Sequence, residues 1–468
     1  METNFIFLSD SYKYTHDSML LSNTDGVYSY FEARQGSQFD TTTFYGLQYL
    51  IKKHLTGPVI TKDVIDEAED LINDHFGMKL FNRDGWEYIL YKYDGCLPLR
   101  IKAVKEGSKI PINNVLMDVE NLGGKKTAFL TNFTETVLTH VWYPTTVATL
   151  SGAGKNLLRK YLEETCSETG DILNGILEFQ LHDFGCRGTE TMEASAIGGS
   201  AHLLNFNGTD TIPALRIPSG YYNSKPKELF GWSVRATEHS IMTSRGEEGE
   251  FTVVEELLEK NPTGILAMVI DSYNYVRFLE TCGTKYKEKI LNRDGRIVFR
   301  PDSGDIIKVS QNCLELLGKH FGYSVNNKGY KVLPNQVRVL WGDGIDLTGI
   351  DTILKVSKQN GWSSENWVFG MGGGLLQKIN RDNCRFAFKC SSQLYDGAWH
   401  DVQKIPLDKS KASKAGRLAL IKLPDGSYKT IREEELIKPE DNLLETVFEC
   451  GKLIRSQSFT DIRSLARS

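Results

Sequence analysis

The sequence predicts a mixed α/β fold, in which an irregular TIM-like βα barrel occupies the middle of the chain and a β-rich α+β domain is built from both chain ends. Three observations lead there: apolar runs in the middle each end in a polar or glycine-rich loop, helical segments separate these runs, and strand-like segments gather near the termini. Strands that alternate with helices form a parallel sheet or barrel. We expect boundaries at residues 1–148, 149–390 and 391–468.

Composition is that of an ordinary globular protein. The chain has 468 residues, 40% hydrophobic and 25% charged, with a net charge of −5, which argues against a dedicated nucleic-acid binder. The start lacks the basic and long apolar segments of a signal peptide, and no run reaches membrane-spanning length. The 8 cysteines are scattered and form no CxxC pair, so we expect no protein-held metal and a reduced, cytoplasmic protein.

The chain ends carry strand and helix signals. Leu97–Ala103 alternates apolar and polar residues, the period of a half-buried strand. Residues 418–431 predict a hairpin around a Pro-Asp-Gly turn, and Cys450–Gly451 is a second candidate turn. Thr61 is a plausible cap for a helix whose apolar residues between 64 and 72 share one face.

The middle predicts the strands and helices of the barrel. The expected strands are residues 176–181, 264–270, 296–299, 337–341 and 367–369, and the expected helices include 193–204 and 251–259. In a βα barrel the loops after the strands carry the chemistry, and phosphate often binds after the last two strands. Here the loops after the last two strands are the glycine-rich ones.

The loop Gly370–Gly374 contains three consecutive glycines, among them Gly372 and Gly373. Backbone N–H groups without a Cβ to block approach make an anion cradle, so we favour a phosphate site over a simple tight turn. Leu375 excludes the dinucleotide-binding fingerprint, which needs glycine there.

Three other loops carry candidate chemistry. Gly342-Asp343-Gly344 is a weak signal for sugar hydroxyls or a metal, because Asp-Gly is common in turns. In Arg300-Pro301-Asp302-Ser303-Gly304 a phosphate-binding fork and a structural Arg–Asp pair are equally good readings. His239 taken alone is better explained as an ordinary histidine than as a catalytic one.

Together these strings resemble the nicotinamide phosphoribosyltransferases, a branch of the type II phosphoribosyltransferase family. The resemblance runs from about Asp10 to Phe459. Its strings are Asp10-Ser-Tyr-Lys13, Val27-Tyr-Ser-Tyr-Phe-Glu32, Phe44-Tyr-Gly-Leu-Gln48, Trp142-Tyr-Pro-Thr-Thr-Val-Ala148, His182-Asp-Phe-Gly185, Gly208-Thr-Asp210, Glu238-His-Ser240, Arg300–Gly304, Gly342–Gly344, Gly372–Lys378 and Ser456-Gln-Ser-Phe459.

The resemblance implies a fold, a reaction and partners. The fold is a barrel-like α/β domain with a β-rich domain from both ends, in a homodimer whose active sites lie at the interface. The reaction converts nicotinamide and phosphoribosyl pyrophosphate into nicotinamide mononucleotide and pyrophosphate, a step of NAD salvage. Mg²⁺ assists as cofactor, and ATP is a co-substrate that acts through a phosphohistidine. Neither nucleic acid nor membrane is an expected partner.

The same resemblance implies a role for each matching residue. Phe184 and Tyr12 of the partner subunit stack on the pyridine ring, Arg187 lies near the ring and pyrophosphate, and Asp210 accepts a hydrogen bond from the carboxamide. His239 is phosphorylated, and Asp271 orients it. The phosphoribosyl group is held by Arg300, Pro301, Asp302, Gly342, Asp343, Gly372, Gly373 and Arg381. Further cations near pyrophosphate or ATP are Arg34, Lys389, Lys404 and Lys411.

Elementary electrostatics agrees with these roles. Displacement at the anomeric carbon leaves positive charge on the sugar and negative charge on the departing pyrophosphate, so carboxylates are needed near one and cations near the other. Asp302 and Asp343 supply the carboxylates, and Arg187 and Arg300 the cations. The acid at position 210 disfavours nicotinate, because like charges in a partly dry site cost several kcal/mol, roughly.

Three alternatives stay open. Nicotinate phosphoribosyltransferase is the nearest, and Asp210 argues against it. A non-catalytic interaction protein on the same scaffold has no need of Arg187, Asp210, His239 and Arg300 together. A generic barrel enzyme for sugar phosphates explains the glycine loops but not the set of Phe184, Arg187 and Asp210.

Overall fold

The structure is a computed structural model that describes residues 4–225, 227–405 and 413–468. The chain divides into two compact units. Unit 1 comprises Met1–Thr149, Ile217–Pro226 and Asn380–Ser468, and unit 2 comprises Leu150–Arg216 and Lys227–Ile379. Both chain ends therefore contribute to unit 1, as the sequence predicts. Residues 380–390, which we expected in the middle part, belong to unit 1 because they lead into a strand of its sheet.

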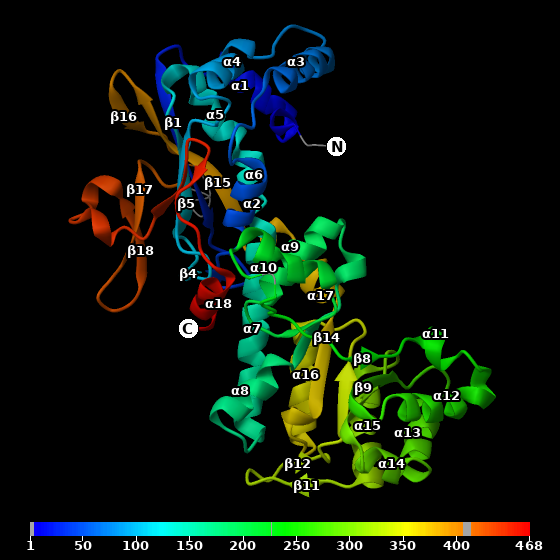
Figure 1. The fold of residues 1–468 in the computed structure, drawn as a ribbon. Coiled ribbons are helices and arrows are strands. Elements are labelled where there is room, and N and C mark those ends of the chain that lie inside the picture. The colour runs from blue at the N-terminus through cyan, green and yellow to red at the C-terminus, as the bar shows by residue number, and fades with distance from the viewer. Residues whose placement is uncertain (1–3, 226, 406–412) are drawn as a thin grey trace. The chain divides into compact units, whose positions relative to one another are not determined.

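Unit 1 is built on an antiparallel seven-stranded sheet (Figure 1). In spatial order its strands are β16 (Ala398–Asp401), β15 (Phe386–Tyr395), β1 (Thr24–Ala33), β5 (Val115–Asn121), β3 (Leu99–Ala103), β19 (Glu445–Glu449) and β20 (Lys452–Leu453). The pair β1 and β15 joins strands from opposite chain ends, with Phe31 opposite Phe388. Their pairing explains how the two ends form one sheet.

Local signals in unit 1 match the structure. β3 alternates buried and half-buried residues, as its sequence period requires. The two predicted hairpins are β17 (Leu418–Lys422) with β18 (Tyr428–Arg432), and β19 with β20. The predicted helix is α3 (Lys62–Phe76), where the Thr61 hydroxyl accepts a hydrogen bond from the backbone N–H of Val64 at 3.3 Å.

Short strands and helices complete unit 1. They are β2 (Thr41–Thr43), β4 (Lys109–Pro111), α1 (His16–Met19), α2 (Leu47–His54), α4 (Arg83–Lys92), α5 (Ala128–Phe133), α6 (Glu135–Thr139), α10 (Ile217–Tyr221) and α18 (Phe459–Arg467). The chain passes from unit 1 to unit 2 within the long helix α7 (Trp142–Thr165).

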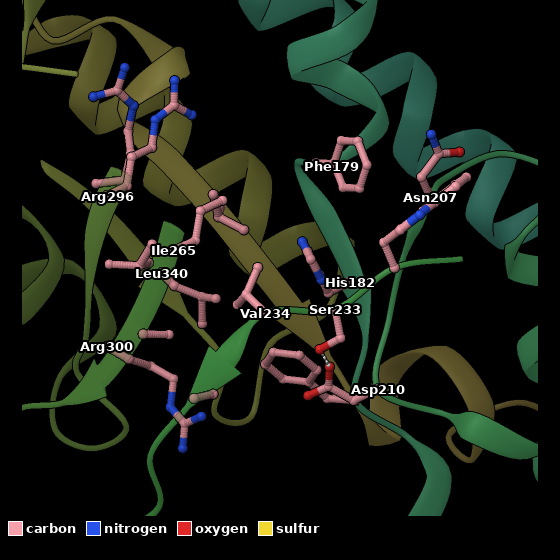
Figure 2. A pocket seen from close by; sticks show the side chains of 17 residues that line it. Phe179, His182, Asn207, Asp210, Ser233, Val234, Ile265, Arg296, Arg300 and Leu340 are labelled. Atoms are coloured by element: carbon pink, nitrogen blue, oxygen red, sulfur yellow. Dashed lines mark hydrogen bonds between the residues drawn. The ribbon is translucent and has the colours of Figure 1, made fainter. Parts of the chain in front are cut away.

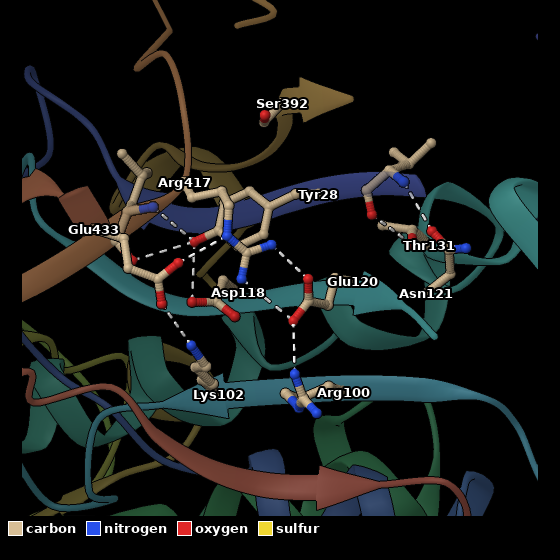
Figure 3. A network of polar contacts seen from close by, with 12 residues as sticks. Tyr28, Arg100, Lys102, Asp118, Glu120, Asn121, Thr131, Ser392, Arg417 and Glu433 are labelled. Atoms are coloured by element: carbon tan, nitrogen blue, oxygen red, sulfur yellow. Dashed lines mark hydrogen bonds and ion pairs between the residues drawn. The ribbon is translucent and has the colours of Figure 1, made fainter. Parts of the chain in front are cut away.

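Charged side chains form a network on the unit 1 sheet (Figure 3). The Arg417 guanidinium pairs with Glu120 at 2.5 Å and with Glu433 at 2.7 Å. Glu433 also accepts from Lys102 at 2.9 Å. Buried Asp118, between these groups, accepts a hydrogen bond from the Tyr28 hydroxyl at 3.0 Å. The network ties strands from both chain ends together.

Unit 2 is built on a parallel seven-stranded sheet. In spatial order its strands are β7 (Gly208–Thr209), β6 (Leu181–Asp183), β14 (Trp367–Met371), β13 (Val337–Trp341), β10 (Asp294–Arg300), β9 (Thr263–Val269) and β8 (Arg235–Ala236). Gly208 of edge strand β7 also forms a parallel bridge to Trp232, just before the other edge strand, β8. The sheet thus curls on itself as a barrel, and the predicted fold class is confirmed.

Helices follow the strands of unit 2, as expected for a βα barrel. They are α8 (Gly170–Glu178), α9 (Met192–His202), α11 (His239–Met242), α12 (Gly246–Lys260), α13 (Tyr275–Thr284), α14 (Lys287–Leu291), α15 (Ile306–Phe321), α16 (Leu347–Gln359) and α17 (Gly373–Leu376), and the small hairpin β11 (Ser324–Val325) and β12 (Lys331–Val332) follows α15.

One expected strand of the middle is wrong. Residues 176–178 lie in the last turn of α8, and only Leu181 belongs to β6. Leu173 and Leu177 are both buried on one face of α8, a spacing that favours the helix over an extended run. The other four predicted strands correspond to β9, β10, β13 and β14. Across the described ranges, no helix is both long and apolar enough to cross a bilayer.

Candidate active site

A cavity of about 550 Å³ lies inside the unit 2 barrel. Three of the predicted site residues, Phe184, Asp210 and Arg300, line it (Figure 2). Each follows or ends a different strand, namely β6, β7 and β10. Its middle is apolar, because Ala267, Val298 and Leu340 form a buried cluster against which Phe184, Val234 and Val368 pack. A cavity of this size suits a small ligand.

The Phe184 ring lies against the backbone of β14. The backbone N–H of Phe184 donates a hydrogen bond to the carbonyl of Met371 at 3.1 Å. A Cβ on Gly370 would stand 2.0 Å from the ring carbon Cε2, and a Cβ on Gly342 would stand 3.3 Å from the same atom. The ring can occupy this position because residue 370 is glycine, whereas a Cβ at position 342 would make only a tight contact.

Asp210 is held from two sides. Its backbone N–H donates to the carbonyl of Asp183 at 2.9 Å, and the Ser233 hydroxyl donates to Asp210 Oδ1 at 2.5 Å. Among the described residues none donates a hydrogen bond to the other oxygen, Oδ2. Asp183 is fully buried, and burial raises the pKa of its carboxyl to about 6. Ser233 was missed by the sequence analysis, since a single serine carries no signal.

Asp271 joins the loops after β8, β9 and β10. Its Oδ2 accepts hydrogen bonds from the backbone N–H of Asp302, at 3.1 Å, and from the Ser303 hydroxyl. Its other oxygen, Oδ1, lies 3.4 Å from Nε2 of His239. The His239 side chain is 49% exposed and that of Asp271 6%. A half-exposed imidazole thus faces a buried carboxylate oxygen that has no hydrogen-bond partner among the described residues.

The arginines of the site differ in their surroundings. Arg300 Nη2 lies 3.5 Å from Asp302 Oδ2, and its buried Nε has no hydrogen-bond partner. Arg187 is exposed on the short helical turn Cys186–Gly188, on the same loop as Phe184. Both arginines therefore have guanidinium N–H groups that can donate hydrogen bonds to an anion. The predicted Arg300–Asp302 contact exists, but it is long, so it does not saturate the guanidinium.

The two glycine loops lie beside these residues. A Cβ on Gly342 would come within 3.6 Å of Asp302 Oδ1, and one on Gly372 within 3.1 Å of the Phe184 carbonyl oxygen. Asp343 is exposed, and its carbonyl accepts a hydrogen bond from Nε1 of Trp341 at 2.8 Å. Gly373 begins α17. Both glycine loops therefore approach Phe184, and the loop at Gly342 also approaches Asp302.

The remaining predicted residues belong to unit 1. Lys389 lies on β15, and burial lowers the pKa of its ammonium, Glu135 raises it, and Arg34, Lys404 and Arg381 lower it to a smaller degree. Four predicted cations thus influence one another, with the carboxylate of Glu135 among them. Tyr12 is exposed, with its ring edge-on to His16 at 5.2 Å between centroids. Lys411 lies outside the described residues.

Family models match most of the chain. One, described as the nicotinate phosphoribosyltransferase (NAPRTase) family, matches residues 179–452. Another, the nicotinamide phosphoribosyltransferase N-terminal domain, matches residues 4–101.

Individual relatives agree with these models. A nicotinamide phosphoribosyltransferase of Xanthomonas campestris is 41% identical over 99% of this chain and 98% of its own length. One from Acinetobacter baylyi is 31% identical, covering 97% of this chain and 95% of its own length. The crystal structure of a nicotinate-nucleotide pyrophosphorylase from Pyrococcus furiosus shares the fold, with a TM-score of 0.63 at 13% identity over 99% of this chain and 95% of that chain. The chain belongs to the nicotinate phosphoribosyltransferase family, and within it to the group of nicotinamide phosphoribosyltransferases.

Proposed function

We propose that this protein transfers the phosphoribosyl group of phosphoribosyl pyrophosphate to nicotinamide, yielding nicotinamide mononucleotide and pyrophosphate for NAD salvage. The observation that carries the choice of base is the Asp210 carboxylate, fixed by Ser233 at the mouth of an apolar cavity beside Phe184. The aromatic ring offers a stacking surface for the pyridine. The carboxylate accepts an amide N–H and repels the carboxylate of nicotinate.

The charges around the cavity mouth suit the transfer itself. Asp302 and Asp343 are carboxylates that stabilise positive charge on the ribose, and Arg187 and Arg300 are cations that stabilise the leaving pyrophosphate. Arg300 and Asp302 lie 3.5 Å apart, so both charges sit at one point of the site. The glycine loop from 370 to 374 provides backbone N–H groups for the 5′-phosphate.

Replacing Asp210 with Asn tests the choice of base. The isosteric amide removes the charge but keeps the size. Loss of a hydrogen bond to a charged group, about 1.5–3 kcal/mol, lowers kcat/KM for nicotinamide by roughly 10- to 150-fold. Discrimination against nicotinate should fall at the same time.

The measurement is mononucleotide formation from each base with phosphoribosyl pyrophosphate and Mg²⁺. Ser233→Ala, which loosens the carboxylate without removing it, is the companion variant and should have the smaller effect. A wild-type preference for nicotinate would overturn the proposal.

We also propose that ATP assists the reaction by phosphorylating His239. The imidazole is exposed and lies 3.4 Å from the Asp271 carboxylate, as a histidine that acts as nucleophile with a carboxylate beside it would. Mg²⁺ fits this chemistry, because it binds mainly through substrate phosphates with one or two carboxylates. Asp302 and Asp343 would be the carboxylates that contribute to holding it.

Two further parts of the proposal concern the assembly and its location. We propose a homodimer in which Tyr12 of the partner subunit stacks on the pyridine ring opposite Phe184. Exposure of Tyr12, at 55%, fits a residue that acts on another chain. We place the protein in the cytoplasm, a location supported by its 8 free cysteines.

A further inference from the structure

Asp183 is a buried carboxylate to which the transfer reaction gives no role. It is the last residue of β6 and is fully buried. It pairs with Met371 of β14 on one side and with Thr209 of β7 on the other. Phe184 follows Asp183 directly in the sequence, and Asp210 follows Thr209. Asp183 therefore lies between the two residues to which we assign the pyridine ring and the carboxamide.

The side chain of Asp183 closes the turn that carries Phe184. Its Oδ1 accepts a hydrogen bond from the backbone N–H of Gly185 at 2.7 Å. A side-chain oxygen that accepts from the N–H two residues further on forms an Asx turn, and the residue between the two is held at its centre. Leu376 of α17 supports the turn, since a Cβ on Gly185 would stand 2.7 Å from its Cδ1 atom. The direction of the Phe184 side chain therefore depends on this carboxylate.

The main chain of Asp183 holds the other nicotinamide contact. Its carbonyl accepts a hydrogen bond from the backbone N–H of Asp210 at 2.9 Å. One residue thus places the aromatic ring through its side chain and the carboxamide acceptor through its backbone. A ligand gains fully from two contacts only when the groups behind them fix their relative position.

Packing alone does not require a carboxylate at this place. Its second oxygen, Oδ2, is buried and has no hydrogen-bond partner in the parts of the chain that the structure describes, which costs stability. Burial raises the pKa of Asp183, and the Gly185 N–H and the Thr211 hydroxyl lower it, although this hydroxyl lies outside hydrogen-bond geometry.

The helix α9 makes room for the same oxygen. A Cβ on Gly199, inside this helix, would stand 2.9 Å from Asp183 Oδ2. Glycine inside a helix is unfavourable. Two unfavourable local features that together accommodate one carboxylate indicate a functional position.

We infer that Asp183 is a positioning residue for nicotinamide, whose carboxylate holds the turn at Gly185 and so fixes the Phe184 ring on which the pyridine stacks. It touches no substrate, because it is fully buried. The inference rests on the proposed function for the identity of the base. Weakening the turn should impair binding of the base more than the chemical step, because Arg300 and Asp302 follow another strand.

Asp183→Ala removes the acceptor. Loss of a hydrogen bond to a carboxylate should raise the KM for nicotinamide about tenfold or more, with kcat within about twofold of the wild type. Asp183→Asn keeps an acceptor for Gly185 and should restore most of the affinity. Asn73→Ala is the control, because Asn73 of unit 1 also accepts backbone hydrogen bonds, from Leu80 and Phe81. It should lower Tm and leave the KM unchanged.

Gly199→Ala reaches the same carboxylate from α9 and replaces Asp183→Ala if that variant does not fold. Its Cβ would press on Oδ2, so the KM should rise, whereas Gly175→Ala in α8, with open space at its Cβ, should leave the KM unchanged. Amide hydrogen exchange at Gly185, followed by NMR without ligand, measures the turn itself. In Asp183→Ala this amide should exchange about tenfold faster than in the wild type, and in Asp183→Asn nearly as slowly.

A wild-type KM for nicotinamide in Asp183→Ala would overturn the positioning role, even if Gly185 exchanges faster. A fall in kcat as large as the rise in KM would also overturn it, because the residue would then act on the chemical step. A wild-type protein that does not use nicotinamide would contradict the proposed function instead. Slow exchange at Gly185 that depends on Asp183 would still be seen in that case.

Discussion

Gly370 and Phe184 depend on each other at the level of single atoms. The ring carbon Cε2 would lie 2.0 Å from a Cβ at position 370, far inside van der Waals contact. The sequence analysis assigned the glycines of this loop to a phosphate, and for Gly370 the structure shows a second need, close packing of an aromatic ring. From consecutive glycines in a sequence one cannot tell which glycine allows a ligand to approach the backbone and which makes room for a neighbouring side chain.

Gly370→Ala is therefore expected to displace the Phe184 ring. Overpacking costs about 1–3 kcal/mol, so Tm should fall and the KM for nicotinamide should rise. Gly175→Ala is the control, because Gly175 lies in α8 with nothing within 4 Å of its would-be Cβ. That change should stabilise the protein by about 0.5–1 kcal/mol. Thermal unfolding and steady-state kinetics measure both. An unchanged KM in Gly370→Ala would contradict the packing role.

His239→Ala is expected to abolish nicotinamide-dependent ATP hydrolysis and to leave slow ATP-independent product formation. The reason is that the exposed His239 imidazole, 3.4 Å from Asp271, is the group that we propose accepts the phosphoryl group. Parallel assays of ADP and mononucleotide, with and without ATP, give the two rates. ATP coupling that persists in the variant would rule out a phosphohistidine at this position.

At the scale of elements, periodicity predicts long strands well and very short ones not at all. β3, β13 and the hairpin of β17 and β18 were predicted because their burial follows from sequence alternation or from a continuous apolar run. β7 and β8 have two residues each, too few for a period to show. The apolar run at residues 176–181 is compatible with a helix or with a strand. Tertiary packing, which the sequence does not show, decides between the two.

The strand β5 supplies a prediction about pH. Asp118 on this strand is buried, and burial raises its pKa from the usual 3.8 to about 7, with Lys102 lowering and Glu120 raising it. Between these two values the unfolded chain has released the proton and the folded protein still holds it. The free energy of unfolding therefore falls as pH rises from about 4 to 7.

Asp118→Asn should flatten this pH dependence and raise stability at pH 7. The shift of about 3 units corresponds to at most about 4 kcal/mol, and the amide oxygen can still accept the Tyr28 hydroxyl. Urea unfolding at several pH values, with the exposed Asp425→Asn as control, measures the effect. A slope identical to the wild type would mean that Asp118 is ionised in the folded protein.

At the scale of the whole molecule, both ends of the chain belong to unit 1, and the middle of the chain forms unit 2. The sequence predicted this organisation because both ends show strand signals around a βα middle. It could not place the insertion Ile217–Pro226, a ten-residue excursion of the barrel sequence into unit 1. Ten residues are too few for their composition to differ recognisably from that of the flanking sequence. Only their contacts in the structure assign them to unit 1.

The proposed homodimer makes a prediction about mixed assemblies. Tyr12→Ala and Asp210→Ala should each impair the sites of their own dimers. After subunit exchange, one of the two sites in a mixed dimer has both residues intact, so up to about a quarter of wild-type activity should return, since about half the dimers are mixed. Activity is measured before and after exchange, with exchange verified by differently tagged chains. An absence of recovery would argue against a shared site.

Asp271 connects the loop that carries His239 to the loop that carries Asp302 and Ser303. Because its two oxygens face different loops, a new negative charge on His239 would push on the same carboxylate that anchors Asp302 and Ser303. The position of the loop at Asp302 and Ser303 would then depend on whether His239 is phosphorylated, as well as on the bound substrate. A phosphoryl group on His239 and the position of the loop at Asp302 would thus be coupled through one carboxylate.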